Sequence, residues 1–299
     1  MSKTFVLCHG TWHEGWAWGE VVRCISMHGH RPYAPTLAGH GPGAERLVIT
    51  HEDCVDSVTT CIRQHDLRDV VLVGHSFGGK VVQRVASVLR DRIARMVFLD
   101  ALVLKDGERV FDILPEVFLD SLAPRNGSDP AAGLDMSPGV LAPPPWKTWR
   151  DNFIQDGPES LARSTWERLS PEPNQVNLDR LDLKRFDSLA IPKSYIHCRH
   201  DKAMPAGYFH PQMSSRLGAF RLLEMDGGHE VMFTRPSELT EKIIAATADD
   251  WSEFRERDAG TAPLTPTDAV APCSRKSSAA VPDSQSEHGP SQEELPPSA

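Results

Sequence analysis

A serine in the surroundings expected of a catalytic nucleophile lies in the run Gly74-His75-Ser76-Phe77-Gly78-Gly79. Glycines two residues before and after it form the G-x-S-x-G pattern, which is typical of a serine on a tight turn between a strand and a helix. On such a turn the hydroxyl projects above the sheet, and amides at the start of the helix can stabilise an oxyanion. A glycine-rich turn with an incidental serine is the alternative.

A serine hydroxyl needs a base, and the base needs a third group that orients it. On the scaffold that carries this pattern, the acid and then the histidine follow the serine along the chain. His229, after two glycines, is the favoured base, and a solvated loop histidine is the alternative. Asp201 is the favoured acid. Asp100 is its rival, because it also follows an apolar run and precedes His229.

An acyl-transfer site also needs donors for the oxyanion. The expected donors are the backbone amides of Phe77 and Thr11, with Trp12 as the less favoured alternative to Thr11. A simple strand-ending turn at His9-Gly10 is the other interpretation of that segment. Aromatic residues of the middle segment are expected either to pack in its core or to contact a substrate. The expected substrate-binding residues are Gly10, Trp12, His75, Trp146 and Trp149.

Alternating strands and helices must position these residues. Short apolar runs predict strands over residues 4–8, 31–34, 70–73, 96–99, 193–198 and 220–224. Helical periodicity is present over residues 14–28, 51–65, 81–89 and 237–254. This alternation predicts an α/β fold with a mostly parallel sheet of about six strands and helices on both faces.

Composition divides the chain into three parts. Residues 1–104 and 190–258 are expected to form the sheet domain, and residues 105–189, rich in proline and tryptophan, a mostly helical cap over it. Residues 259–299 contain seven prolines and few large apolar side chains, which predicts a disordered tail. A linear binding motif and a cloning remnant are alternatives for the tail. Truncation near residue 258 is expected to preserve activity.

Charge and cysteine usage exclude several classes of protein. The 299-residue chain has a net charge of −9, whereas sequence-independent nucleic-acid binding needs a basic face. A membrane span needs about 18 apolar residues, and no run approaches that length. The six cysteines lack zinc-ligand spacing, and no secretory signal is evident. We expect a cytoplasmic protein with reduced thiols, no metal and no cofactor. The oligomeric state stays open, a homodimer included.

These segments together resemble the α/β-hydrolase superfamily, and more narrowly the plant methylesterase and hydroxynitrile lyase group with its bacterial esterase relatives, pyrethroid-cleaving esterases among them. The resemblance covers about residues 3–250, and its most specific motifs lie at residues 9–18, 35–41, 69–79, 201–205 and 227–229. It implies a six-stranded parallel sheet, a helical cap and a Ser76–Asp201–His229 triad. It also implies oxyanion donors at Thr11 and Phe77.

Two departures favour hydrolysis over cyanohydrin cleavage. Gly10 stands where the lyases have a threonine, and Glu230 follows His229 where they have a lysine. The sequence therefore predicts a serine carboxylic ester hydrolase that acts through an acyl-enzyme on a small to medium, largely apolar or aromatic ester. A lactone or thioester would use the same groups. The alternatives are a hydroxynitrile lyase-like enzyme, a cofactor-free oxygenase and a non-catalytic receptor for a small ligand.

Overall fold

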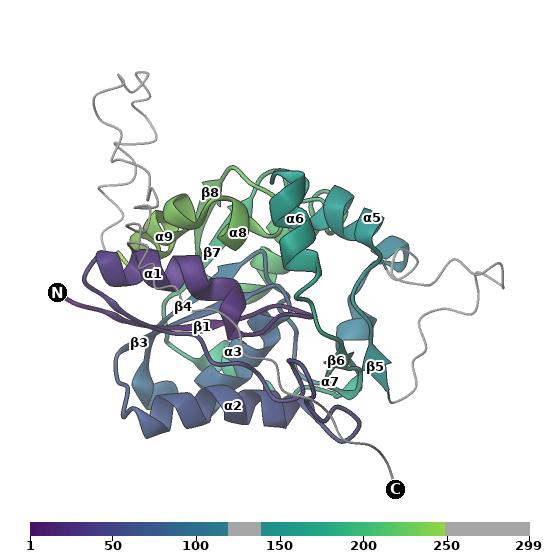
Figure 1. Cartoon of the computed structure of the whole chain (residues 1–299). Helices are drawn as coiled ribbons and strands as arrows, with labels where there is room; N and C mark the ends of the chain where they lie inside the picture. Colours follow the sequence, from purple (N-terminus) through teal and green to yellow (C-terminus); the bar gives the residue numbers. More distant parts are fainter. Residues whose placement is uncertain (119–138, 249–299) are drawn as a thin grey trace, which may run out of the picture. The chain divides into compact units, whose positions relative to one another are not determined.

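The computed structural model of the chain describes residues 1–118 and 139–248 (Figure 1). The predicted tail at residues 259–299 lies outside these residues. The helix predicted over 237–254 ends at Ala245, so the prediction is wrong for residues 246–248, and its remainder lies outside the described residues.

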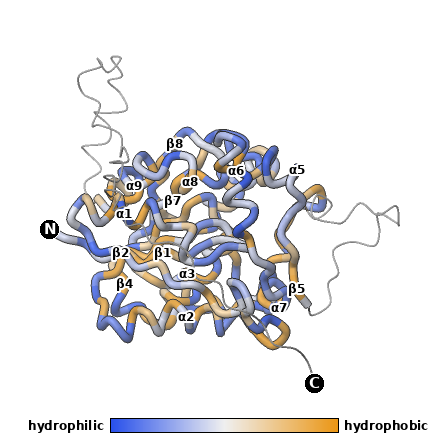
Figure 2. The backbone as a smooth tube through the Cα atoms, in the orientation of Figure 1, coloured by the Kyte–Doolittle hydropathy of each residue, from blue (hydrophilic) through white to orange (hydrophobic). Residues whose placement is uncertain are grey.

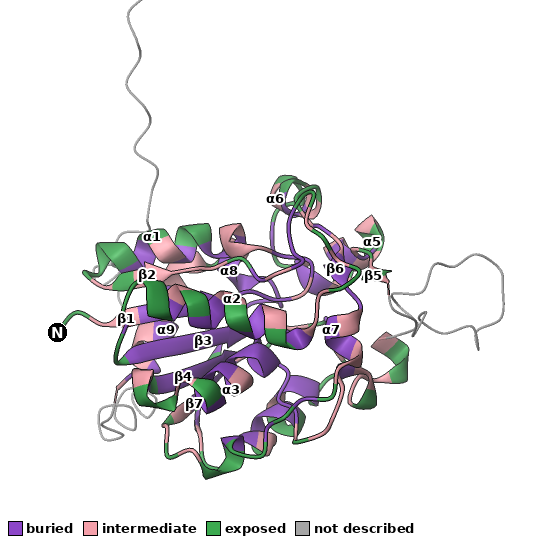
Figure 3. Cartoon of the chain, turned by 90° about the horizontal axis from the view of Figure 1, so that it is seen from below, coloured by how far each residue is buried: buried purple, intermediate pink, exposed green. Residues whose placement is uncertain are grey.

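Six parallel strands form the central sheet, as the sequence predicts. Their order across the sheet is β2-β1-β3-β4-β7-β8. The strands are β1 (Thr4–Cys8), β2 (Arg31–Tyr33), β3 (Val70–His75), β4 (Ile93–Leu99), β7 (Lys193–Cys198) and β8 (Arg221–Met225). Every residue of β3 is buried, which explains its continuous apolar sequence (Figure 3). Because all the strands run the same way, their carboxyl ends meet at one edge, where side chains far apart in the sequence can converge.

Helices cover both faces of the sheet (Figure 1). One face carries α1 (Gly19–Met27), α8 (Val231–Thr234) and α9 (Pro236–Ala245), and the other carries α2 (His51–Gln64) and α3 (Gly78–Val88). Helix α2 begins at a capping box in which Thr50 and Asp53 satisfy each other's backbone amides. Orange and blue alternate along α2 in Figure 2, because its apolar stripe packs on the sheet and its polar face meets solvent.

The segment between β4 and β7 contains short helices, as expected, and also a small antiparallel pair of strands that the sequence interpretation did not include. Its described helices and strands are a 3-10 turn at Val110–Asp112, β5 (Val140–Leu141), α5 (Trp146–Thr148), a π-helical turn at Trp149–Phe153, α6 (Glu159–Trp166), β6 (Glu172–Pro173), α7 (Gln175–Leu178) and a 3-10 turn at Phe186–Ser188. Strand β6 contacts the sheet domain directly, since Glu172 Oε2 lies 3.3 Å from His40 Nε2. The segment is therefore attached by buried polar contacts as well as by apolar packing.

Within residues 1–118 and 139–248, no helix is long and apolar enough to cross a membrane. The five cysteines in those ranges are free thiols. The same residues contain no cluster of histidine, cysteine and carboxylate side chains suited to holding a metal ion.

Candidate active site

Ser76 lies on a strained turn between β3 and α3. Its φ of 50° is in the left-handed region, which is uncommon for a residue with a side chain. The turn is held on both sides, because the Ser76 amide donates to the Leu99 carbonyl and the Leu102 amide donates to the Ser76 carbonyl. A Cβ at Gly78 would lie 2.7 Å from the carbonyl oxygens of Cys8 and His9, so close packing against β1 requires glycine there. The glycines of the motif thus allow the turn that presents Ser76.

His229 and Asp201 meet at the carboxyl edge of the sheet. His229 Nδ1 lies 2.6 Å from Asp201 Oδ2, and each side chain is only 3% exposed. The second Asp201 oxygen accepts a hydrogen bond from the Ala203 amide at 2.7 Å, which orients the carboxylate. Burial alone would lower the pKa of His229, but the Asp201 carboxylate outweighs it and the pKa of His229 rises to about 9. His229 is thereby fixed in one tautomer, with Nδ1 carrying the proton that Asp201 accepts.

Asp100, the rival acid, lies behind Asp201 and has other partners. It is fully buried, one of its oxygens accepts from the Cys198 amide at 3.0 Å, and the other lies 2.9 Å from His197 Nδ1. Burial first, and then the neighbouring Asp201 carboxylate, raise the pKa of Asp100 well above its usual value. Burial thus disfavours the charged form of Asp100, whereas Asp201 makes the direct contact with His229. The geometry favours Asp201 over Asp100.

The two expected oxyanion donors, Thr11 and Phe77, lie on the wall of the pocket that Ser76 and His229 line. In the part of the chain that the structure describes, neither backbone amide donates a hydrogen bond to another protein atom. Phe77 also immediately precedes α3, at the positive end of that helix dipole. Both amides are thus available to a developing negative charge beside Ser76.

The pocket beside Ser76 is mainly apolar. About 630 Å³ of space free of protein atoms lies within it, open solvent at its mouth included. Apolar side chains from the sheet edge and from the middle segment form most of its wall. They are Trp12, Phe77, Leu102, Val110, Phe111, Leu114, Phe118, Leu141, Phe153, Ala203 and Met204.

Three of the five predicted substrate-binding residues lie at Ser76, in different ways. Trp12 and His75 line the pocket. His75 also braces the base, because its Nε2 lies 3.1 Å from the His229 carbonyl oxygen, to which it donates. Gly10 lies behind the wall: a Cβ there would be 3.0 Å from the His75 ring and 3.2 Å from Ser76 Cβ. Gly10 therefore leaves room for the nucleophile, whereas Trp12 and His75 can contact a ligand.

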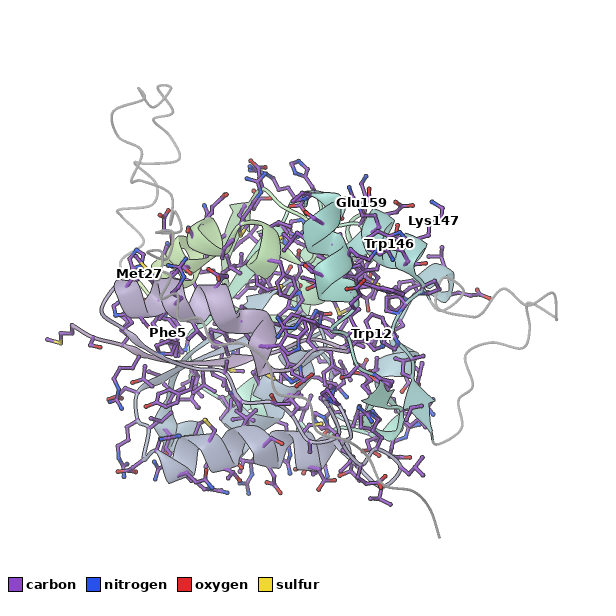
Figure 4. The ribbon with its side chains drawn as sticks, in the orientation of Figure 1. Phe5, Trp12, Met27, Trp146, Lys147 and Glu159 are labelled. Carbon is purple, nitrogen blue, oxygen red and sulfur yellow. The ribbon has the colours of Figure 1, made fainter. Side chains whose placement is uncertain are left out.

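The two predicted cap tryptophans, Trp146 and Trp149, do not line this pocket, which corrects the expectation from sequence. Trp149 is fully buried, donates its indole N–H to the Ala162 carbonyl and stacks on Phe153. Trp146 packs against Arg163 on the outer side of the middle segment, while Trp12 lies further inside (Figure 4). Phe153 lines the pocket instead, with its ring centroid 5.5 Å from that of the His229 ring.

Four polar residues on the pocket wall were not predicted as site residues: His13, Glu172, Asn177 and Glu230. Asn177 donates to Glu172 at 2.8 Å, and both come from the middle segment. No local pattern marks them, because their position depends on how that segment packs. His13 lies inside a recognised motif and Glu230 directly follows another, so their proximity to Ser76 could have been inferred from sequence, but their contact with each other could not.

Residues 5–242 match the sequence pattern of the family described as "Alpha/beta hydrolase family". The match spans the sheet, the turn at Ser76, and both Asp201 and His229.

The chain belongs to the alpha/beta hydrolase family.

Its relatives in this family include enzymes named for ester cleavage. The carbendazim hydrolyzing esterase of Nocardioides sp. (strain SG-4G) is 31% identical over 81% of this chain and 98% of its own length. The pyrethroid hydrolase of Sphingobium wenxiniae is 25% identical over 88% of this chain and 94% of its own length. Plant proteins named methylesterase and alpha-hydroxynitrile lyase also match. The resemblance inferred from the motifs is confirmed.

A solved structure supports the same assignment. An extracellular alpha/beta-hydrolase from a Paenibacillus species superposes with a TM-score of 0.73 at 37% identity, over 83% of this chain and all of that one. That protein is described as sharing structural and functional homology with tobacco salicylic acid binding protein 2. The predicted alpha/beta hydrolase fold is therefore confirmed.

Proposed function

We propose that this alpha/beta hydrolase is a serine esterase that cleaves small to medium, largely apolar or aromatic carboxylic esters through an acyl-enzyme. One observation carries the proposal. His229 is held by Asp201 at 2.6 Å and lines one pocket with Ser76, which lies on a strained turn. The relatives named for ester hydrolysis support the same reaction class.

In the first half of the reaction, Ser76 Oγ attacks the ester carbonyl carbon while His229 Nε2 takes the hydroxyl proton. The amides of Phe77 and Thr11 donate hydrogen bonds to the oxyanion that forms. Asp201 keeps the His229 proton on Nδ1 and stabilises the imidazolium. The imidazolium then gives its proton to the leaving alcohol, and the acyl group stays on Ser76.

In the second half, His229 takes a proton from water as the water oxygen attacks the acyl-enzyme carbonyl. The same two amides hold the second oxyanion, and collapse releases the carboxylic acid and returns the proton to Ser76. Every step uses groups of the protein, the substrate and this water molecule. The apolar wall, with Phe153, Leu141 and Phe118 on it, favours substrates that bury an aromatic or aliphatic group.

A panel of p-nitrophenyl and methyl esters, run on the wild type and on Ser76→Ala, tests the proposal. Removal of the nucleophile is expected to lower kcat by at least about 10³-fold, since only binding and oxyanion stabilisation remain. Ser26→Ala is the matched control, because the exposed Ser26 hydroxyl bonds only within its own helix. Turnover by Ser76→Ala within about tenfold of the wild type would refute the mechanism.

Two further assays separate the other activities that the sequence leaves open. Cleavage of mandelonitrile that survives Ser76→Ala, with no ester turnover in either protein, would indicate a lyase. Failure of Ser76 to react with a fluorophosphonate would indicate a ligand receptor. We expect fluorophosphonate labelling of the wild type and of Ser26→Ala, and none of Ser76→Ala.

A further inference from the structure

Two buried polar side chains face each other on the pocket wall next to His229. His13 Nε2 and Glu230 Oε2 lie 3.4 Å apart, and each side chain is only 2% exposed. Both residues line the same pocket as Ser76, and Glu230 directly follows His229. Among the residues that the structure describes, neither of these two atoms has a hydrogen-bond partner of good geometry.

The hydrogen bonds of His13 determine where its proton lies. His13 Nδ1 is 2.7 Å from the Thr11 carbonyl oxygen, which can only accept, so Nδ1 carries the proton. Burial lowers the pKa of His13 to about 3, and the ring is therefore neutral near pH 7. His13 Nε2 is therefore left with a lone pair, 3.4 Å from Glu230 Oε2.

A proton on Glu230 consequently suits the contact with His13 better than a negative charge does. Burial raises the pKa of Glu230 to about 8, so its carboxyl group keeps a proton near pH 7. An unprotonated carboxyl oxygen 3.4 Å from a lone pair is repelled, whereas an O–H on Oε2 can turn toward His13 Nε2. The other carboxyl oxygen of Glu230 then remains an acceptor that His13 does not use.

In these apolar surroundings, the His13–Glu230 pair destabilises the fold unless a ligand forms a hydrogen bond with it. The His13 ring packs against Trp16, Trp149 and Phe233, with ring centroids 5.7–5.8 Å away. A buried polar group that lacks a partner destabilises the fold. The 3.4 Å separation is also longer than a relaxed hydrogen bond between an oxygen and a nitrogen. The polar atoms of the pair can therefore still form a hydrogen bond with a ligand.

Building on the proposed esterase activity, we propose that Glu230, positioned by His13, determines substrate specificity by accepting a hydrogen bond from an N–H or O–H group of the substrate. Preferred substrates are therefore esters that carry such a donor close to the scissile carbonyl, because Glu230 is the immediate neighbour of His229. The aromatic wall receives the apolar part of the same molecule, and the Glu230 acceptor selects among molecules of equal size.

Two esters of matched size and electronic character test the inference. Methyl mandelate carries an α-hydroxyl that donates, whereas methyl α-fluorophenylacetate carries a fluorine of similar size and electron withdrawal that does not. Measured for each enantiomer, kcat/KM of the wild type is expected to be about tenfold higher for one enantiomer of the hydroxy ester than for the fluoro ester of the same geometry.

Two variants show whether Glu230 produces this preference. Glu230→Gln keeps the pattern of the neutral acid, because the amide N–H donates to His13 and the amide oxygen still accepts. It is expected to retain the preference for the hydroxy ester. Glu230→Met has a similar size and no acceptor of comparable strength, and its ratio of the two kcat/KM values is expected to fall to about one. Ratios within one protein are compared, so a general change in turnover does not affect the result.

The outcomes separate this inference from the function on which it rests. A wild type that hydrolyses both esters equally, or a preference that survives Glu230→Met, would overturn the role of Glu230 and leave the esterase proposal standing. A wild type that hydrolyses no ester would overturn the esterase proposal instead. If Glu230→Met does not fold, the kcat/KM ratios of the wild type and of Glu230→Gln decide the role of Glu230. A wild-type ratio of about one, or loss of the preference for the hydroxy ester in Glu230→Gln, would then overturn it.

Discussion

The choice between the two buried acids can be tested by replacing each with asparagine. Asp201→Asn removes the carboxylate that lies 2.6 Å from His229, and Asp100→Asn replaces a fully buried acid whose pKa is raised well above its usual value. Both substitutions conserve size, so differences in packing are small. The pair therefore isolates the charge that orients the base.

The magnitude follows from the pKa of His229. The net rise from 6.5 to about 9 corresponds to about 3 kcal/mol of stabilisation of the imidazolium over the neutral ring. That imidazolium forms in the transition state. Loss of this stabilisation alone therefore lowers kcat by roughly 10²–10³-fold. The asparagine amide can also donate toward Nδ1 and favour the wrong tautomer, which brings the expected loss for Asp201→Asn to about 10³–10⁴-fold.

Asp100→Asn is expected to lower kcat by less than about tenfold, because one of its oxygen contacts, to the Cys198 amide, can be kept. The assay is kcat/KM for p-nitrophenyl acetate between pH 6 and pH 10, with circular dichroism to verify folding. An equal loss in both variants, or an Asp201→Asn enzyme within tenfold of the wild type, would refute the assignment of Asp201 as the orienting acid.

Three further predictions concern packing, the corrected tryptophan and pH. Gly78→Ala places a Cβ 2.7 Å from two carbonyl oxygens and should lower the free energy of unfolding by about 1–3 kcal/mol, measured as a lower Tm. Gly19→Ala is the control, because a Cβ there meets nothing within 4 Å and should not lower Tm. Trp149→Phe should lower Tm with KM unchanged, since it removes a buried hydrogen bond behind the pocket wall; a raised KM with unchanged Tm would contradict this. Above its own pKa of about 8, Glu230 is ionised and raises the pKa of His229. Because the base acts only when neutral, Glu230→Gln should shift the acid limb of the kcat/KM profile to a pH below about 9. An unshifted or higher limb would argue against this coupling.

Much of the fold could be predicted because the signals are local. The continuous apolar run in β3 predicts a strand covered on both faces, and the periodicity of α2 predicts a helix packed on one side. The small β5–β6 pair was missed because each strand is two residues long and includes no repeated pattern. Its pairing depends on the rest of the middle segment.

The candidate site was predictable only in part, for a related reason. The turn at Ser76 is encoded by neighbouring glycines, so its geometry can be inferred from a few residues. Asp100 and Asp201 both follow strands of the same sheet, β4 and β7, and sequence order alone leaves them equivalent. Their environments differ in the folded protein, since Asp201 reaches His229 while Asp100 is enclosed behind it.

The sequence by itself determined the parallel sheet, the turn that presents Ser76 and the family to which the chain belongs, because each depends on residues close together in the chain. Only the tertiary structure decided that Phe153 forms the pocket wall in front of Trp149, and that His13 faces Glu230. Such contacts join distant segments, and their geometry depends on the packing of the sheet and the middle segment together. The same burial also sets the protonation of Glu230, which no local pattern encodes.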